Sequence, residues 1–348
     1  MQIDMHMFGT YTLARAAGIN DRTARTIAIT SQFVDESVHD DNIVVSNQYA
    51  ILPTMTSHSM LDFQNMAQNG QQWHVWVPFH FLPGNESTTG TFIERLTCRK
   101  NSKIAQKMVQ DALDESNRNL WPHLIGITAH VYADTFSHFG FSGISSKSNL
   151  VADVKLNNPV HSLTEELNKV AGKFAGIIPM GHGTASVFPD IPFLSWDLKH
   201  EGDTPQQRTA IKRNNAADFL DASRELHNFF TQYAAKDTTI TDPQTKRNWA
   251  DIEKNVNQIL NTPNEDTDAR SNLWKKAIND GIFFQPTKFD QGITYDPHQW
   301  DVKNLFTGVS VQQDQAKSFH ACKFLRAAHH HRHHVVHQLL PSFGLLVP

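Results

Sequence analysis

Apolar residues recur every three or four positions along much of the chain, which is the spacing of helices that bury one face. The predicted helices cover residues 9–38, 102–118, 161–175, 205–236, 246–261, 268–279 and 312–340. Another predicted helix begins at Pro122, because proline is well tolerated in a first helical turn. Asn20 or Asp21 can cap the helix over residues 9–38. The pattern predicts a mostly α protein.

The segments between these helices are expected to be irregular. Residues 42–53 alternate weakly and predict a short hairpin or extended segment. We expect residues 73–85, which are aromatic and contain two prolines, to form a buried loop, and residues 145–160 and 281–300 to be loops. Glycine and proline prevent residues 177–196 from forming one helix. We predict one helical-bundle domain with long loops, in which residues 1–200 form the core and residues 201–348 a helical C-terminal extension packed on it.

Composition excludes several classes of protein. The hydrophobic content of 39% is sufficient for a packed core, which excludes wholesale disorder. The net charge of −4 excludes recruitment of nucleic acid by a general basic field. Two cysteines are too few for a disulfide framework or a cysteine-based zinc site. The first residues lack a signal-peptide pattern and no stretch approaches 18 apolar residues, so we expect a cytoplasmic protein without a membrane span. The sequence leaves the oligomeric state open.

His130, Asp134 and His138 follow one another at intervals of four residues in the helix that begins at Pro122. This spacing places all three side chains on nearly one helix face. Two imidazoles and a carboxylate can hold a divalent metal, or they can form a buried hydrogen-bonded ladder. We favour the metal, since burying these groups without partners is costly.

Other histidines and aspartates extend the candidate metal site. Asp35 is expected at a helix C-terminus, where the helix dipole disfavours an anion that has no cation partner. His182 lies between two glycines that permit close approach of the backbone. Asp190 is alternatively a turn residue, and His80 is expected to be a buried structural histidine. The remaining candidate ligands are Asp4, His6 and His58.

A ligand set of imidazoles and carboxylates suits zinc best, and also manganese or iron at a hydrolytic centre. Several such ligands allow more than one ion, and paired ions can activate water for phosphoester displacement. The sequence therefore predicts a divalent metal, with zinc favoured, and a small-molecule or lipid phosphoester as the substrate.

The stretch HVYADTFSHFGFSG, which starts at His130, resembles the core signature of the zinc-dependent phospholipase C and single-strand nuclease superfamily. It is closer still to the variant in heterokaryon-incompatibility C proteins. Asp35 in SQFVDES and His58 in TSHSMLD fit the order of ligands in that superfamily, and His161 with Glu165 resembles a later ligand pair. The resemblance implies a phospholipase C-like helical core, zinc and phosphoester hydrolysis.

The sequence departs from that superfamily in two ways. The secreted phospholipases use an N-terminal tryptophan as a ligand, and this sequence has none near its start, so Asp4 or His6 would have to replace it. His138 follows Asp134 by four residues, where the phospholipases have six residues and a proline.

A broader resemblance joins the chain to an uncharacterised bacterial domain family. It rests on MQIDMH, SQFVDES, VWVPFHFLPGN, GITAHVYADTFSHFGFSG and GHGTASVFPDIPFLSW, which extend over roughly the first two hundred residues. This family implies no established activity.

Alternative functions remain open. The His39–Asp40 pair in VHDD resembles the signature of all-α phosphohydrolases, but the helix that should follow it is missing. No GxSxG, P-loop or HExxH motif is present, which excludes serine hydrolases, P-loop NTPases and zincins on motif. The histidine run from His329 to His337 predicts a polar helix with incidental metal affinity. We predict a metal-dependent phosphoester hydrolase; the alternatives are a non-catalytic, metal-stabilised helical protein that acts in recognition or binding, and a metal-free helical protein.

Overall fold

Helix α8 (Trp121–Ser137) runs through the middle of the computed structural model and is buried along almost its whole length. The helices that contact it most extensively are α2 (Asp21–Phe33), α7 (Lys103–Leu113), α10 (Asn215–Lys236) and α16 (His320–His334). The structure describes residues 1–39, 41–46, 49–58, 72–86, 89–158, 180–201, 210–306 and 312–346. Pro122 lies in the first turn of α8, as predicted.

Gly126 allows α2 and α8 to approach each other closely. A β carbon at this position would lie 2.6 Å from the carbonyl oxygen of Ile27 and 2.6 Å from the β carbon of Thr30. Only glycine fits such a contact between two backbones. The close approach brings the C-terminal end of α2 beside the middle of α8.

The N-terminal segment forms three helical pieces, and the last two divide the single helix that the sequence predicted over residues 9–38. The pieces are the π-helix η1 (Asp4–Gly9), α1 (Thr10–Ala16) and α2. Gly18 has a φ of +89° and breaks the chain between α1 and α2. The predicted cap is confirmed, because the side chain of Asn20 accepts a hydrogen bond of 2.9 Å from the backbone N–H of Thr23.

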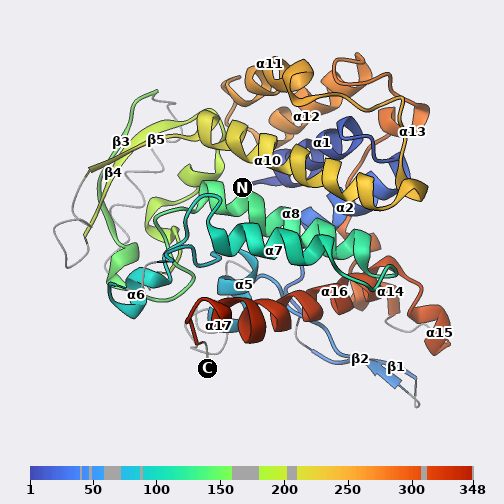
Figure 1. The fold of residues 1–348 in the computed structure, drawn as a ribbon, viewed down its shortest axis with the longest axis horizontal. Coiled ribbons are helices and arrows are strands. Elements are labelled where there is room, and N and C mark those ends of the chain that lie inside the picture. Colours follow the sequence, from blue (N-terminus) through green and yellow to red (C-terminus); the bar gives the residue numbers. More distant parts are fainter. Residues whose placement is uncertain are drawn as a thin grey trace.

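A three-stranded antiparallel sheet lies at one end of α10 (Figure 1). Its strands are β3 (Val151–Leu156), β4 (Ser195–His200) and β5 (Ala210–Asn214), in the order β3-β4-β5. The prediction of a loop over 145–160 is therefore wrong, and so is the predicted helix start at residue 205, since β5 precedes α10. These strands are short and partly exposed, so their alternation is weak in the sequence.

The remaining elements mostly agree with the predicted segments. The hairpin of β1 (Ile43–Ser46) and β2 (Tyr49–Ile51) is confirmed. The predicted buried loop over 73–85 instead starts with two helical pieces, η2 (Gln72–Trp76) and α5 (Val77–Phe79). The helices α11 (Trp249–Leu260) and α12 (Thr267–Asn279) match their predictions. The predicted helix over 161–175 lies outside the described residues.

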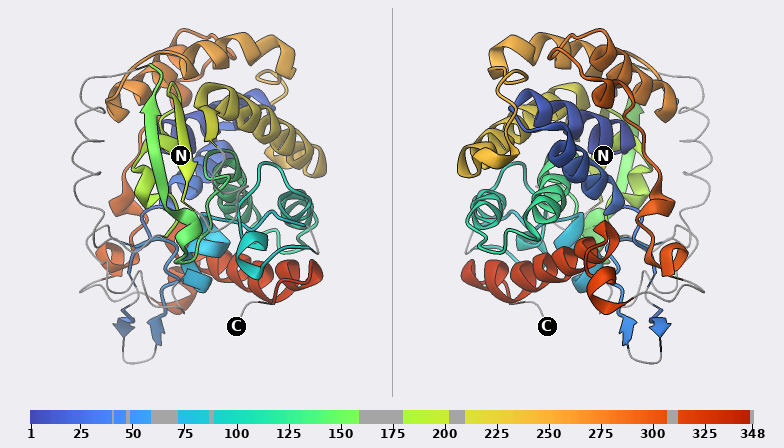
Figure 2. Two further views of the ribbon diagram at one scale, coloured as in Figure 1. Left: turned by 90° about the vertical axis from the view of Figure 1, so that its left-hand side faces the viewer. Right: turned by 90° about the vertical axis from the view of Figure 1, so that its right-hand side faces the viewer.

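Shorter elements complete the fold. They are α6 (Phe92–Arg95), η3 (Lys147–Asn149), η5 (Gly183–Ala185), η6 (Phe188–Asp190), η7 (Thr238–Ile240), α13 (Lys288–Gln291), η8 (Pro297–Gln299), α14 (Val302–Phe306), α15 (Gln313–Ala316), η9 (Val335–Leu339) and α17 (Leu340–Ser342). The predicted terminal helix over 312–340 is thus divided among α15, α16, η9 and α17. In both views of Figure 2, α11 and α12 lie on one side of the molecule and α16 on the other.

The main apolar core contains residues from the whole length of the chain, among them Met7, Val131, Phe230 and Phe324. A smaller core lies against the sheet and contains Trp196. The prediction of a mostly α protein is confirmed, but the sheet means that the molecule is not purely a helical bundle. The division into a core over residues 1–200 and a C-terminal extension over residues 201–348 stays a prediction. In the described part of the chain, no helix has both the length and the apolarity that crossing a membrane requires.

Candidate metal centre

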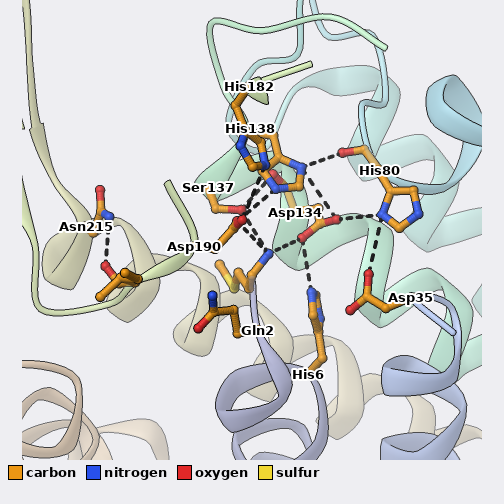
Figure 3. A network of polar contacts seen from close by, with 12 residues as sticks. Gln2, His6, Asp35, His80, Asp134, Ser137, His138, His182, Asp190 and Asn215 are labelled. Carbon is orange, nitrogen blue, oxygen red and sulfur yellow. Dashed lines mark hydrogen bonds and ion pairs between the residues drawn. The ribbon is translucent and has the colours of Figure 1, made fainter. Parts of the chain in front are cut away.

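Eight histidine and aspartate side chains meet beside the C-terminal half of α8, and all of them except His130 are labelled in Figure 3. They come from six separate parts of the chain: η1, the turn after α2, the residue after α5, α8 with its C-cap, the residue before η5, and the end of η6. The eight are His6, Asp35, His80, His130, Asp134, His138, His182 and Asp190. We refer to them as the His/Asp centre.

The carboxylate of Asp134 lies in the middle of the centre. Its Oδ2 atom is 3.2 Å from Nε2 of His130, 3.4 Å from Nδ1 of His80 and 3.5 Å from Nδ1 of His138. Its Oδ1 atom is 3.2 Å from Nε2 of His6 and 2.8 Å from the amino group of Met1. One carboxylate therefore touches four imidazoles.

Two further carboxylates lie on either side of Asp134. Asp190 Oδ1 is 3.0 Å from Nε2 of His138, and its Oδ2 is 3.3 Å from Nε2 of His182. Asp35 Oδ1 is 3.8 Å from Nδ1 of His80 and 3.7 Å from Nε2 of His130. The ligand atoms fall into three groups, each within 4.8 Å: His6, His130 and Asp134; Asp35, His80 and His130; His138, His182 and Asp190.

Backbone carbonyls hold one nitrogen of four of these rings. His130 donates from Nδ1 to the carbonyl of Ser31 at 2.8 Å, and His80 donates from Nε2 to the carbonyl of Thr56 at 2.8 Å. The Nδ1 atoms of His138 and His182 donate to the carbonyls of His80 and Ser186, both at 2.8 Å. A neutral imidazole has one N–H, so the second nitrogen of each ring presents a lone pair to the centre. Fixing a ring in this way is typical of metal-binding histidines.

His6 completes the centre from the N-terminal side. Its ring stacks on that of His130, with centroids 3.8 Å apart. Burial and the neighbouring His130 lower the pKa of His6 to about 4, so this ring is neutral near pH 7. Burial likewise lowers the pKa of His182 to about 4, although the carboxylate of Asp190 opposes the shift. Both rings are therefore available as neutral ligands.

The carboxylates remain ionised despite their burial. Burial alone would raise the pKa of Asp134, but His138 and the amino group of Met1 outweigh it and hold the pKa well below its usual range. The same balance, with the amino group and His182 as the main partners, holds the pKa of Asp190 well below its usual range. Burial lowers the pKa of the Met1 amino group, yet Asp134 and Asp190 raise it to about 11. Burial lowers the pKa of His80, but its hydrogen bond with Asp134 and the charge of Asp35 outweigh this effect and raise the pKa. The centre thus combines ionised carboxylates with imidazoles of which His6 and His182 are neutral, and this is the ligand chemistry of zinc and related ions.

Most of the centre is shielded from solvent, but two edges are open. The side chains of His6, His130 and Asp134 are at most 1% exposed. Asp35 at one edge is 32% exposed, and His182 at the other is 17% exposed. At the second edge the buried Arg213 donates to the carbonyls of Ser137 and Phe139, which fixes the C-terminal end of α8 near His138.

Seven of the nine residues predicted as ligands lie in the centre, and two do not. Asp4 is buried in an ion pair with Arg270, whose Nε lies 2.9 Å from Asp4 Oδ2. His58 lies outside the centre, separated from it by the ring of Trp76. Its ring stacks on that of Trp76, with centroids 5.7 Å apart, and Trp76 in turn contacts the ring of His80. Neither residue belongs to the three ligand groups.

His80 was expected to be a buried structural histidine; it is buried, and in addition its ring lies among the residues of the centre. The ring lies between Asp35 and Asp134. No spacing rule relates residue 80 to α8, so only its position in an aromatic, apolar segment marked it as buried.

Two other motifs fall wholly or partly outside the described residues. His161 and Glu165 lie outside the described residues, and so does Asp40 of VHDD. His39 is 38% exposed and lies 3.5 Å from Asp301. Because Asp40 is outside the described residues, the alternative of a His–Asp phosphohydrolase site is not tested.

Comparison with known proteins identifies a family but no activity. A search of curated proteins and of solved structures finds no match. A relationship to phospholipase C or to nucleases is therefore not shown, and neither is a phospholipase C-like core. Residues 1–339 match the family DUF6765, which is described as a family of unknown function. The chain belongs to this family.

Proposed function

We propose that the His/Asp centre binds divalent metal ions, with zinc favoured, and that the protein is a metal-dependent hydrolase of phosphoesters. One observation carries the proposal: Nε2 of His130 lies 3.3 Å from Nδ1 of His80, although both rings donate their N–H to backbone carbonyls. While both rings are neutral, two lone pairs and the carboxylate of Asp134 face one another in a buried site. A bound cation removes this repulsion without adding protons.

The ligand set favours more than one ion. The eight side chains of the centre exceed the four ligands that one zinc ion takes, although the Met1 ammonium offsets one of the three carboxylate charges. Asp134 contacts His130 on one side and His138 on the other, which suits a carboxylate shared between neighbouring ions. Such ions supply Lewis acidity and a water nucleophile for phosphoester displacement.

The chain's own residues then have separate roles. His80, His130 and His138 are oriented by backbone carbonyls and would hold ions in fixed positions. Asp35 is the most exposed member, and it alone combines contact with the centre and solvent access on that edge. It is suited to bind an incoming water and to accept its proton.

Metal analysis followed by assay tests this proposal. We expect at least one equivalent of zinc in the purified chain, largely lost in Asp134→Ala and retained in His39→Gln, which removes an imidazole outside the centre. Metal-loaded protein should cleave p-nitrophenyl phosphate or bis-p-nitrophenyl phosphate. A chelator should abolish the cleavage, and zinc should restore it. If Asp134→Ala retains all of the metal, the centre is not the binding site and the proposal fails.

A second function is favoured by the burial of the ligands. Five of the eight side chains are at most 6% exposed, which suits a closed structural site. In this case the ions stabilise the fold of a protein that acts by recognition. It predicts the same loss of metal in Asp134→Ala and a lower melting temperature after chelation, but no cleavage of any phosphoester.

A further inference from the structure

A cavity of about 890 Å³ lies beside α16. Its wall is formed by α16, by the end of β2 with the residues that follow it, by α15 and by Leu120 just before α8. Sites for small organic molecules have volumes of about 300–1,000 Å³, so this cavity is large enough for one. None of the residues that line it belongs to the His/Asp centre. We refer to it as the α16 cavity.

Much of the wall of the α16 cavity is apolar. Leu120, Cys322 and Leu325 line it and are buried, and Leu52, which also lines it, is 69% exposed. Burial raises the pKa of the Cys322 thiol to about 11, so this side chain is uncharged near pH 7. Such a wall favours contact with an apolar part of a ligand.

The polar part of the wall is basic. Arg326 and Arg332 of α16 line the cavity, and so do Lys317, His329, His330 and His333. No carboxylate is among the described residues that line it. The sequence from Gln315 to Pro348 contains no aspartate or glutamate, although the whole chain has a net charge of −4. This local surplus of positive charge favours an anion.

Arg332 is a half-buried cation without an anionic partner. Among the described residues its guanidinium forms no hydrogen bond or ion pair, whereas Lys317 is paired with Asp314 at 3.3 Å. Burial lowers the pKa of Arg332, because a charge partly removed from water is disfavoured. The planar fork of N–H donors in arginine matches a carboxylate or a phosphate. An anionic ligand would supply the missing partner.

Arg332 also borders a smaller cavity, of about 190 Å³. His329 and His333 line both cavities with it, and their spacing of three and four residues places all three side chains on one face of α16. Burial and the charge of Arg332 lower the pKa values of His74, which lines the smaller cavity, and of His329. Neutral imidazoles can donate hydrogen bonds to an anion beside Arg332.

We propose that the α16 cavity binds an anion with an alkyl or acyl chain, whose carboxylate or phosphate is bound by Arg332 and whose chain lies against the apolar wall. His329 and His333 are placed to contact the same head group, and Arg326 adds positive charge. Several separate segments of the chain surround the cavity, which suits a single molecule better than the surface of a bilayer. This inference does not depend on the proposed hydrolase function.

Isothermal titration calorimetry of the full chain tests the site. The probes are dodecanoate and dodecylphosphonate, used below the concentrations at which they form micelles. Neither is a phosphoester, so hydrolysis at the His/Asp centre cannot affect the measurement. We expect both to bind at least about tenfold more tightly than dodecyltrimethylammonium or inorganic phosphate, because only these two probes combine a chain with an anionic head group.

Two matched variants of α16 locate the head group. Arg332→Gln removes the positive charge and the fork of donors, so it should weaken dodecanoate binding by at least about tenfold. Lys323→Gln removes a cation of the same helix that lines neither cavity, and it should bind as the unmodified chain does. Circular dichroism of each variant shows whether it is folded.

Three results would overturn the proposal. If the unmodified chain binds dodecyltrimethylammonium as tightly as dodecanoate, the cavity does not select an anion; this comparison needs no variant, so it decides the question even if Arg332→Gln does not fold. If folded Arg332→Gln and Lys323→Gln bind dodecanoate equally, Arg332 does not bind the head group. If the chain sediments with vesicles of phosphatidylcholine and phosphatidylserine but does not bind dodecanoate, this basic face contacts membranes and holds no single ligand.

Discussion

The Nε2 atom of His130 and the Nδ1 atom of His80 lie 3.3 Å apart inside the protein, and each ring donates its other nitrogen to a backbone carbonyl. The residues are 50 positions apart in the sequence. Their rings meet nearly at right angles, with centroids 5.1 Å apart. Neither nitrogen can donate to the other while both rings are neutral, so this contact needs either a proton on His80, whose pKa is raised, or a cation beside the two rings.

His80 should therefore be essential for metal binding, although its position in the sequence gave no reason to expect this. His80→Ala should weaken zinc binding by at least about tenfold. The matched variant is His58→Ala, because His58 is a buried histidine one aromatic ring further from the centre. Equilibrium dialysis with zinc measures both. Equal losses in the two variants would contradict the ligand groups described above.

Variants of Asp134 and Asp4 should separate an effect on metal binding from an effect on the stability of the fold. Asp134→Asn should abolish binding, because this carboxylate touches four imidazoles of the centre. Asp4→Asn breaks a buried ion pair with Arg270, so it should destabilise the protein by about 3–5 kcal/mol while the folded fraction keeps its metal. Urea unfolding and elemental analysis of both variants check this. Loss of metal from folded Asp4→Asn protein would place Asp4 in the centre after all.

The sequence could predict that His130, Asp134 and His138 share one face of α8, because their four-residue spacing is a local property of the chain. The grouping of His6, Asp35, His182 and Asp190 around that face depends on tertiary packing, so chemistry and resemblance could nominate these residues but not place them. Asp4 shows the limit clearly. It is two residues from His6, yet it faces Arg270 instead of the centre, and that partner lies 266 residues away in sequence.

The sheet and the broken helices were missed for similar reasons. The strand β5 has only five residues, AIKRN, which do not alternate between polar and apolar, and it directly precedes α10. A helical pattern therefore extends into it from the neighbouring helix. At the N-terminus the predicted helix over 9–38 has an apolar pattern on both sides of Gly18, and only the positive φ of that glycine shows the break.

Gly126 should control both stability and metal affinity. Gly126→Ala places a β carbon 2.6 Å from the carbonyl oxygen of Ile27, so α2 and α8 must move apart, at about 1–3 kcal/mol. The carbonyl of Ser31, which orients His130, belongs to α2 and moves with it. Thermal unfolding and zinc affinity should both decrease. Gly292→Ala is the control, since its β carbon meets nothing closer than 3.6 Å; unchanged affinity in Gly126→Ala would mean that this packing does not position His130.

Asp290 should determine part of the acid stability. It is fully buried and accepts hydrogen bonds from Arg15 at 2.6 Å and Tyr11 at 2.7 Å. Burial raises the pKa of Asp290, but Arg15 and Tyr11 outweigh it, so the pKa in the folded protein is below the usual value. The unfolded chain then binds more protons in that range, and the stabilisation, present above about pH 4, is lost as the pH falls through the folded pKa.

The variant Asp290→Asn tests this assignment. It should cost about 3–5 kcal/mol near pH 7, because Arg15 stays buried without its carboxylate partner. Below pH 4, the free energy of unfolding of the variant should also decrease less steeply with falling pH than that of the unmodified chain. Urea unfolding at a series of pH values measures both effects. An identical acid slope in the two proteins would assign the acid sensitivity to other carboxylates.

The histidine run in α16 cannot be removed by truncation without damaging the fold. The predicted polar helix has a buried face: His331 is 2% exposed and its Nε2 lies 3.0 Å from the carbonyl oxygen of Pro78. The residues after it include Val335, Leu339 and Leu340, which are part of the main core. Each such side chain contributes about 1.5–3 kcal/mol by burial, so their joint loss is comparable to the whole stability of an ordinary domain.

A chain that ends at residue 328 should therefore lose its cooperative unfolding transition, whereas His333→Gln should keep it. Near-UV circular dichroism and urea unfolding distinguish the two outcomes. If the shortened chain unfolded at the same urea concentration as the full chain, the last residues would be an independent appendage. Their burial against the main core argues for the opposite result, and the metal content of α16 is thus best measured in full-length chains with single side chains replaced.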